Sequence, residues 1–321
     1  MKNIWQQLPR PIIGLAPMSG ITDSAFRQIA KDFGAEIVFS EMISADGLFY
    51  GQRKSGRDEY NKTLAIAGFS AKERPIIIQL FGRQPEIMAK AAKIISRKFK
   101  PDGIDINMGC PARRLVEAGH GVSLMRDLDL ACYIIEIIKK EINLPVSVKT
   151  RLGFQSEKEI LKFAKSLENC GLDALILHGR TYPQLFRGQV NYQIMKMVKE
   201  NLKIPLIASG GLYTPEAAIK ILEETGADGL IFAKGVLGNP WIISQTINLL
   251  KSGQYQRPKK KEIFKIALKQ AKLSFKLPRV DAISILKKHL CWYVKGLKNA
   301  TRLRQKLVQI ETLDEIKKIL K

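Results

Sequence analysis

Eight short apolar segments recur along the first 235 residues of this 321-residue chain. Most of them are continuous runs rich in β-branched residues. Strands that are buried on both faces of a parallel sheet have this pattern, whereas half-exposed strands alternate apolar and polar positions. We therefore interpret the segments as parallel β-strands. They begin near Ile12, Ile37, Pro75, Gly103, Pro145, Ala174, Pro205 and Gly229.

Segments with helical periodicity lie between these strands. The first, Ser24–Phe33, follows Thr22 and Asp23, and either side chain could cap it. Residues 156–159 have the Ser-x-x-Glu spacing of a capping box, and Pro215 stands where a helix commonly begins. The other helical segments are residues 85–99, 129–142, 156–170, 192–201 and 215–225.

Eight strand–helix units in series predict an α/β fold, a (β/α)₈ TIM barrel, and the length of this stretch matches that fold. A doubly wound open sheet is the alternative. After Gly253 the strand signal ends, residues 254–261 read as a linker, and helical segments follow at 262–275, 280–296, 300–310 and 313–320. We expect a barrel domain over residues 1–250 and a C-terminal all-α helical-bundle domain over residues 251–321.

Positive charge is concentrated in that C-terminal part. The chain has a formal net charge of +23, and residues 251–321 contain 20 basic and 5 acidic residues. Such a field attracts polyanions and speeds their association, which favours a nucleic acid as partner. A lysine-rich composition that only keeps the chain in solution is the simpler explanation.

Several classes of protein are disfavoured. The four cysteines show no C-x-x-C spacing, so we expect no zinc, no iron–sulfur cluster and no other metal. No run approaches the roughly 20 apolar residues of a membrane span. The N-terminal residues lack the apolar core of a signal peptide. We therefore expect a cytoplasmic protein with no membrane partner.

In a barrel the reactive groups lie at the carboxyl ends of the strands and in the loops that follow. Two glycine-rich turns, residues 210–211 and 235–238, precede helices at the last two strands. Their backbone N–H groups could approach a phosphate, although glycines that only form tight turns are the alternative. The candidates are Ala16, Pro17, Met18, Glu41, Met42, Gln79, Asn107, Cys110, Lys149, Arg151, His178, Arg180, Ser209, Gly210, Gly211, Ala233, Lys234 and Gly235.

Three candidates suggest a flavin. Lys149 lies in an otherwise apolar barrel and would be unfavourable there without an anion or a polar ring. A cation beside the N1–C2 edge of a flavin favours its reduced form, but a Schiff-base lysine is the competing chemistry. Gln79 could match a flavin pyrimidine edge, and His178 could donate to a phosphate or ring edge. Each could equally be a satisfied buried polar group.

Cys110 differs from the other cysteines because it begins a glycine-containing loop in the sequence NMGCP. A buried structural cysteine is the commonest type, but this loop could expose the thiol to a substrate. A thiol can act as a general acid near neutral pH. Cys132, Cys170 and Cys291 fall in helical patterns, and we interpret them as packing residues.

Taken together, these motifs resemble the tRNA-dihydrouridine synthase family, in particular its bacterial B-like subgroup. The resemblance covers essentially the whole chain, and NMGCP with a downstream HGRT is its most specific feature. The matching segments are LAPMSGITDSAFR (15–27), DGIDINMGCPARRLVEAGHG (102–121), VKTRLG (148–153), LHGRT (177–181), IASGGL (207–212) and GNPW (238–241).

The resemblance implies a function and roles for the matching residues. It implies that the enzyme reduces the C5=C6 bond of specific tRNA uridines to 5,6-dihydrouridine. Hydride would pass from N5 of FMN to C6 and a proton from Cys110 to C5, with NAD(P)H, here NADPH, as reductant. The helical domain would bind tRNA, and Asn107, Arg151 and Arg180 would contact the target base or the tRNA backbone. We expect a monomer. FMN would contact Ala16, Pro17, Met18, Gln79, Lys149, His178, Ser209, Gly210, Gly211, Ala233 and Lys234.

Three positions depart from the family pattern. Ala233-Lys234 replaces a frequent Gly-Arg or Ala-Arg, and lysine lacks the bidentate fork of arginine. Ser209-Gly210-Gly211 stands where some members have Asn-Gly-Asp, and Phe186 stands where tyrosine is frequent. Two other functions stay open. An FMN-dependent dehydrogenase of a free pyrimidine leaves the basic tail unexplained, and a tRNA-binding module without catalysis leaves the strand-end residues unexplained.

Overall fold

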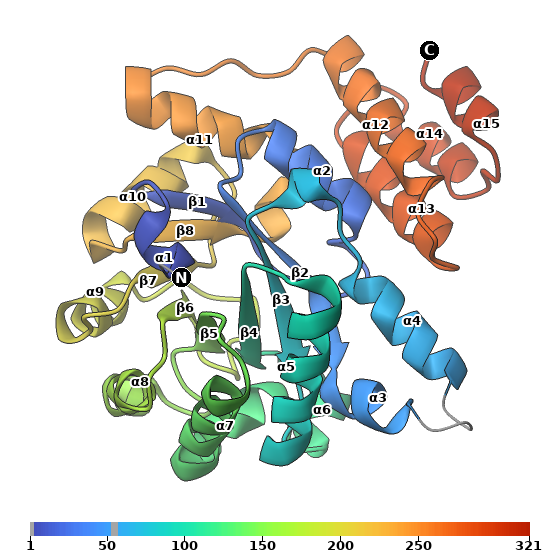
Figure 1. Cartoon of the computed structure of the whole chain (residues 1–321). Helices are drawn as coiled ribbons and strands as arrows, with labels where there is room; N and C mark the ends of the chain where they lie inside the picture. The colour runs from blue at the N-terminus through green and yellow to red at the C-terminus, as the bar shows by residue number, and fades with distance from the viewer. Residues whose placement is uncertain (1–2, 53–56) are drawn as a thin grey trace.

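The computed structural model describes residues 3–52 and 57–321. Its centre is a closed barrel in which eight parallel strands pair in sequence order and β8 returns to β1 (Figure 1). The predicted (β/α)₈ barrel is thus confirmed, and the open sheet is excluded. The strands are β1 (Ile12–Leu15), β2 (Ile37–Ser44), β3 (Ile76–Phe81), β4 (Gly103–Met108), β5 (Val146–Arg151), β6 (Ala174–His178), β7 (Leu206–Ser209) and β8 (Gly229–Phe232).

Helices surround the barrel and continue into the C-terminal part. A short helix, α1 (Ile4–Gln7), precedes β1. The barrel helices are α2 (Ser24–Asp32), α3 (Ala45–Tyr50), α4 (Arg57–Ala67), α5 (Pro85–Phe99), α6 (Arg113–Glu117), α7 (Leu128–Glu141), α8 (Ile160–Asn169), α9 (Tyr192–Asn201), α10 (Pro215–Thr225) and α11 (Trp241–Ser252). The C-terminal helices are α12 (Lys260–Ser274), α13 (Ala282–Tyr293), α14 (Ala300–Leu307) and α15 (Leu313–Ile319).

Local signals placed most helix starts correctly. The Asp23 carboxylate accepts a hydrogen bond from the Phe26 N–H at 2.9 Å, so Asp23 and not Thr22 caps α2. Pro215 occupies the first turn of α10, as predicted. The prediction of a capping box at residues 156–159 was wrong. Ser156 accepts from the Lys158 N–H and caps a 3₁₀ turn, and α8 begins only at Ile160 because that turn comes first.

The apolar core has two layers. One fills the space between the barrel and its helices. The other lies inside the barrel, where inward-facing residues of alternate layers meet. Its buried members are Trp5, Ile12, Ala16, Ile37, Phe39, Ile77, Ala174, Ile176, Ile207 and Ile231.

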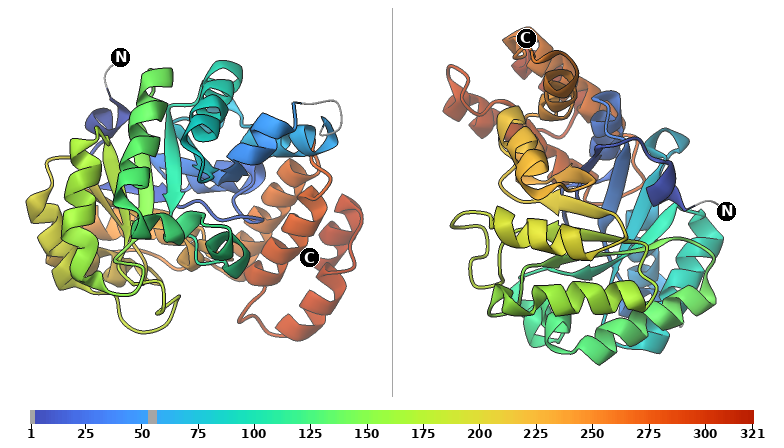
Figure 2. Two further views of the ribbon diagram at one scale, coloured as in Figure 1. Left: turned by 90° about the horizontal axis from the view of Figure 1, so that it is seen from below. Right: turned by 90° about the vertical axis from the view of Figure 1, so that its left-hand side faces the viewer.

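Helices α12–α15 form a helical unit with an apolar cluster of their own, as expected for the predicted helical bundle. Figure 2 shows this unit packed against one side of the barrel, next to α2. Lys269 of α12 forms an ion pair with Asp32 of α2 at 2.7 Å. The predicted boundary at residue 250 falls inside the last turn of α11, and the division into two domains stays a prediction.

Among the described residues, no helix is both long and apolar enough to cross a membrane. Within the same part of the chain, no three histidine, cysteine or acidic side chains come together in a way that could hold a metal ion.

Candidate active site

A cavity of about 460 Å³ opens at the carboxyl ends of the strands. It brings together residues from the loops after most of the strands, as a barrel active site does. Of the eighteen candidates from the sequence, all except Glu41 line it. They include the fifteen that the resemblance assigned to catalysis, cofactor or substrate: Ala16, Pro17, Met18, Gln79, Asn107, Cys110, Lys149, Arg151, His178, Arg180, Ser209, Gly210, Gly211, Ala233 and Lys234. The roles of these residues stay predictions.

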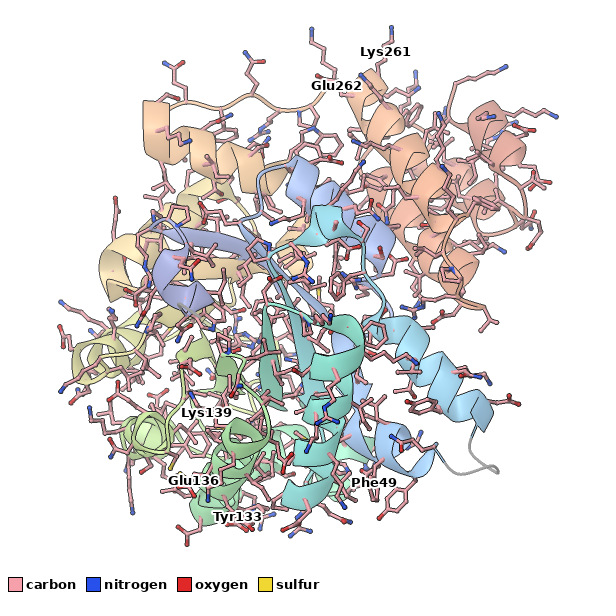
Figure 3. All side chains as sticks on the ribbon, viewed as in Figure 1. Phe49, Tyr133, Glu136, Lys139, Lys261 and Glu262 are labelled. Carbon is pink, nitrogen blue, oxygen red and sulfur yellow. The ribbon has the colours of Figure 1, made fainter. Side chains whose placement is uncertain are left out.

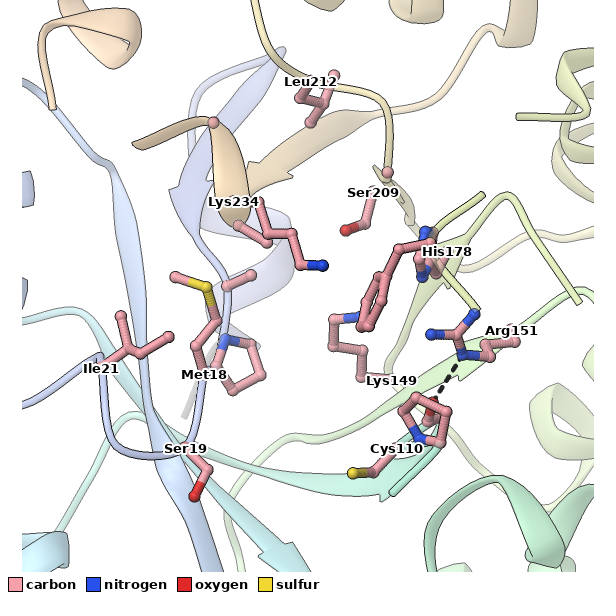
Figure 4. Close-up of a pocket in the computed structure, with 18 of the residues that line it drawn as sticks. Met18, Ser19, Ile21, Cys110, Lys149, Arg151, His178, Ser209, Leu212 and Lys234 are labelled. Atoms are coloured by element: carbon pink, nitrogen blue, oxygen red, sulfur yellow. Dashed lines mark hydrogen bonds between the residues drawn. The ribbon is translucent and has the colours of Figure 1, made fainter. Parts of the chain in front are cut away.

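Positive charge dominates the cavity. Lys149, Arg151, Arg180 and Lys234 line it, and its lining in the described residues includes no carboxylate. Figure 4 shows Lys149 and Lys234 pointing into the same space, with Cys110 at its lower edge in this view. Cys110 and Lys149 therefore share one end of the barrel, so a single ligand could reach both. A site of this charge is suited to an anionic ligand.

The ammonium group of Lys149 is held in an unfavourable environment. Burial lowers its pKa to about 8, and the nearby Arg151 adds to this shift while Asp105 opposes it. Lys149 therefore changes from charged to neutral near pH 8, and an anionic partner would stabilise its charged form.

His178 is uncharged at neutral pH. Burial lowers its pKa to about 2, and the charges of Lys149, Arg151, Arg180 and Lys234 reinforce the shift. The Arg180 guanidinium lies 3.3 Å from Nε2 of His178 and can only donate, so Nε2 accepts. The ring proton then resides on Nδ1, and His178 acts as a neutral hydrogen-bonding group.

The two arginines shape the loop between β6 and α9. Arg180 donates twice to the Gly188 carbonyl, at 2.9 and 3.1 Å. Both side chains are buried, and some of their N–H groups already have backbone partners. Direct contact of either arginine with a substrate stays a prediction. The acceptors of Arg151 are the carbonyls of Gly109 at 2.9 Å, Thr181 at 3.2 Å and Leu185 at 2.8 Å.

The loop that carries Cys110 is held by a set of hydrogen bonds. The side-chain oxygen of Asn107 accepts from the backbone N–H of Gly109 at 3.2 Å and of Cys110 at 2.9 Å. Asn107 Nδ2 donates to Gln79 Oε1 at 3.0 Å, and Gln79 Nε2 donates to Asp105 at 2.7 Å. We call Gln79, Asp105, Asn107 and Cys110 the Cys110 wall.

Two glycine loops form a cradle at another side of the cavity. Gly210 and Gly211 have φ angles of +98° and +76°, which favour glycine. A Cβ on Gly235 would lie 1.9 Å from the Leu212 carbonyl oxygen, so the loops after β7 and β8 touch. Within the described residues, the backbone N–H groups of Gly210, Gly211, Lys234 and Gly235 have no protein acceptor. Such an array of free donors is typical of a phosphate site.

The loop between β1 and α2, residues 16–23, forms the facing wall, and the helical unit holds it. Lys288 Nζ donates to the Gly20 carbonyl at 3.3 Å. His289 Nε2 lies 2.9 Å from the Ile21 carbonyl and must donate to it. Burial lowers the pKa of His289 to about 4, so the ring is neutral at pH 7. We call residues 16–23 the clamped loop.

A buried carboxylate links the same loop to the helical unit. Glu41, in the middle of β2, accepts from the Gly20 N–H and forms an ion pair with Arg279, which also pairs with Asp281 at 2.7 Å. The side chains of Arg279 and Glu41 are 7% and 4% exposed, so solvent screens this pair weakly. From α13, Trp292 reaches the cavity itself.

Two parts of this site were not predicted from the sequence. Asp105 stands two residues before Asn107 in a strand, and that spacing places both side chains on one face. A charged residue inside an apolar strand was the signal that could have revealed it. Trp292 and Arg279 gave no such signal, because their position depends on how α13 docks. Phe186, noted only as a departure, also lines the cavity, and Lys234 Nζ lies 3.2 Å from the centre of its ring.

Fold and site together define a (β/α)₈-barrel protein with a cationic ligand cavity whose rim a helical unit completes. Comparison with known protein families assigns the chain to one of them. The family model described as dihydrouridine synthase (Dus) matches residues 14–321. The chain belongs to the dihydrouridine synthase family, which confirms the resemblance seen in its sequence motifs.

Individual relatives agree with this membership. The chain is 34% identical to "Probable tRNA-dihydrouridine synthase 1" of Synechocystis sp., over 95% of this chain and 84% of that protein. It is 33% identical to "tRNA-dihydrouridine synthase B" of Xanthomonas axonopodis pv. citri, over 95% and 90%. A solved structure, "Crystal structure of Amycolatopsis orientalis BexX/CysO complex", covers 77% of this chain and 94% of its own at 15% identity and a TM-score of 0.47, too distant to bear on function.

Proposed function

We propose that this protein is an FMN-dependent tRNA-dihydrouridine synthase, which reduces the C5=C6 bond of specific uridines in tRNA with NAD(P)H as reductant. One observation carries the proposal. A single cavity is lined by four cations, by two glycine loops with free N–H donors and by the thiol of Cys110. The family membership and the names of the relatives support the same function.

The residues of the cavity fit FMN. The free N–H groups of Gly210, Gly211, Lys234 and Gly235 suit its phosphate. Lys149 suits the edge of the ring that becomes negative on reduction, because its own charge lacks a paired carboxylate in the cavity. When bound, FMN supplies the hydride that C6 of the uracil ring receives. Residues 16–18 of the clamped loop would lie against it.

Cys110 supplies the other half of the reduction. Its thiol would give a proton to C5 of the uracil ring, so that one C–H bond forms while the S–H bond breaks. Asn107 keeps the backbone of Cys110 in place through the hydrogen bond at 2.9 Å. Solvent would return the proton to the thiolate between turnovers.

The helical unit would hold the tRNA. A uridine must leave its stack to enter the cavity, which costs a few kcal/mol that other contacts must offset. Residues 251–321, with 20 basic and 5 acidic residues, would contribute contacts to phosphates without reading sequence. Figure 3 shows Lys261, at the start of α12, pointing away from the barrel into solvent.

The test is a comparison of two cysteine variants. We expect Cys110→Ala to bind FMN and to oxidise NADPH like the unaltered protein, while dihydrouridine formation in tRNA falls by about 10²–10⁴-fold. Cys132→Ala is the matched control, because this thiol lies outside the cavity near the Ser166 carbonyl. Dihydrouridine is quantified by mass spectrometry of digested tRNA.

Two results would contradict the proposal. Unchanged dihydrouridine yield from Cys110→Ala would remove Cys110 from the reaction. A protein that takes up no FMN and forms no dihydrouridine would overturn the function itself. Turnover of free uracil or dihydroorotate at rates that match tRNA would favour the free-pyrimidine dehydrogenase.

A further inference from the structure

Three adjacent strands carry polar side chains on the inner face of the barrel. Gln79 of β3 pairs in register with Asp105 of β4, and Asp105 pairs with Ser147 of β5. The barrel interior also contains a buried apolar cluster, and Lys149 follows Ser147 by two positions on the same face of β5. Asp105 is completely buried, and a buried carboxyl group is unfavourable unless it is hydrogen-bonded. Its two partners are Gln79 Nε2 and Ser147 Oγ, each at 2.7 Å.

The backbone N–H of Cys110 determines which group donates and which accepts in every hydrogen bond of the Cys110 wall. The backbone N–H of Cys110 can only donate, so the oxygen of Asn107 faces it. The amide nitrogen of Asn107 must then face Gln79, which presents its oxygen. This leaves the nitrogen of Gln79 facing Asp105, which accepts. Neither amide in this wall can flip without placing two donors against each other.

We propose that Asp105 is a positioning residue, which fixes the amide of Gln79 at the cavity and, through Asn107, the backbone of Cys110. Gln79 lines the cavity, and the second N–H of its amide has no partner in the part of the chain that the structure describes. The wall therefore offers a hydrogen-bond donor to an acceptor atom of a bound ring. The inference rests on the proposed function for the identity of that ring, FMN, and for the role of Cys110.

The wall needs an acceptor oxygen at position 105 and does not need a charge. Burial raises the pKa of Asp105 to about 7, so the carboxyl group is partly protonated at neutral pH. Its carbonyl oxygen can still accept from Gln79, and its O–H can donate to Ser147. An asparagine would do the same, with its oxygen toward Gln79 and its NH₂ toward Ser147. A leucine of similar size would offer no acceptor and would leave the Gln79 donor unsatisfied.

The experiment compares Asp105→Leu with Asp105→Asn, and uses Ser147→Ala as a control that keeps the bond to Gln79. The first measurement is the alkylation rate of Cys110 by iodoacetamide in FMN-free protein, followed by mass spectrometry of the peptide that contains it. The second is FMN affinity from fluorescence titration. We expect Asp105→Leu to alkylate about fivefold faster and to bind FMN about tenfold more weakly. Ser147→Ala should stay within about twofold of the unaltered protein in both measurements. Asp105→Asn should do so in the alkylation rate, whereas its lost carboxylate also acts on the charge of Lys149 and so on FMN affinity.

Two outcomes would overturn the inference. One is a folded Asp105→Leu with unchanged Cys110 alkylation and FMN affinity. The other is an Asp105→Asn variant in which Cys110 alkylates as fast as in Asp105→Leu, which would make charge the important property. Should Asp105→Leu not fold, Gln79→Met removes the amide that joins Asp105 to Asn107. Faster alkylation of Cys110 in that variant would support the inference, and an unchanged rate would overturn it. An unaltered protein that binds no FMN would contradict the proposed function, while the alkylation measurement would still test Asp105.

Discussion

The Cys110 wall and the clamped loop face the same cavity but are held in different ways. The Cys110 wall uses hydrogen bonds between neighbouring strands, and its partners Gln79 and Asp105 lie 26 positions apart. The clamped loop depends on side chains from the opposite end of the chain. His289 and Ile21 are 268 positions apart, and Arg279 and Glu41 are 238 apart.

The difference shows that the helical unit is part of the cavity. A unit that only attracted tRNA would have no reason to contact residues 16–23. Here Lys288, His289 and Arg279 hold that loop, and Trp292 lines the cavity beside it. Changes in the helical unit should therefore alter ligand binding at the clamped loop and leave the Cys110 wall undisturbed.

The largest effect should come from breaking the clamped loop at its base. Arg27 donates to the Thr22 carbonyl at 2.7 Å and forms a completely buried ion pair with Glu73. Arg27→Met leaves the Glu73 carboxylate buried without its counter-charge. We expect the free energy of unfolding to fall by about 3–5 kcal/mol, measured by urea denaturation.

A surface ion pair provides the control for Arg27. Lys93 and Glu141 are 40% and 39% exposed, so Lys93→Met should change the free energy of unfolding by less than about 1 kcal/mol. Equal losses in the two variants would contradict the distinction between buried and exposed pairs.

A smaller effect should come from Arg279→Met, which separates the clamped loop from the helical unit. Glu41 would keep its bond from the Gly20 N–H but lose its cation. We expect a loss of about 2 kcal/mol in the free energy of unfolding. FMN affinity should fall about threefold, because residues 16–18 belong to the loop, and Cys110 alkylation should not change.

Lys287→Met is the matched control, since Lys287 of α13 pairs with Glu311, which is 74% exposed. Little change in stability or FMN affinity is expected there. If Arg279→Met altered Cys110 alkylation as strongly as FMN affinity, the two walls would not be independent.

The smallest predicted effect is a pH dependence that arises from Lys149. Its pKa of about 8 means that the ammonium group is charged below pH 8 and neutral above it. FMN affinity should therefore be highest below pH 8 and fall about threefold as pH rises from 7 to 9. Lys149→Met should bind more weakly and show no such slope. His178, with a pKa of about 2, should contribute nothing over this range.

Isothermal titration at several pH values measures this slope. An affinity that rises with pH through 8 would contradict the assigned charge of Lys149. A slope that persists in Lys149→Met would assign the titration to another group.

The sequence alone determined the barrel, its strand ends and the part of the cavity lining that lies at those ends. Strand runs, glycine turns and the Pro215 helix start depend on neighbouring residues, and closure of the barrel then brings all the carboxyl ends of the strands together. Residues as distant as Ala16 and Lys234 could therefore be assigned to one site from their positions at strand ends. Helices α3 and α4 were missed because the polar segment between β2 and β3 has weak periodicity.

Only the tertiary structure decided how the cavity is held. The role of Asp105 can be inferred only from the strand register, which places it between Gln79 and Ser147. The contacts of Arg279, His289 and Trp292 depend on the docking of α13 against the barrel. Such docking depends on many contacts between residues far apart in the sequence, so local periodicity does not predict it.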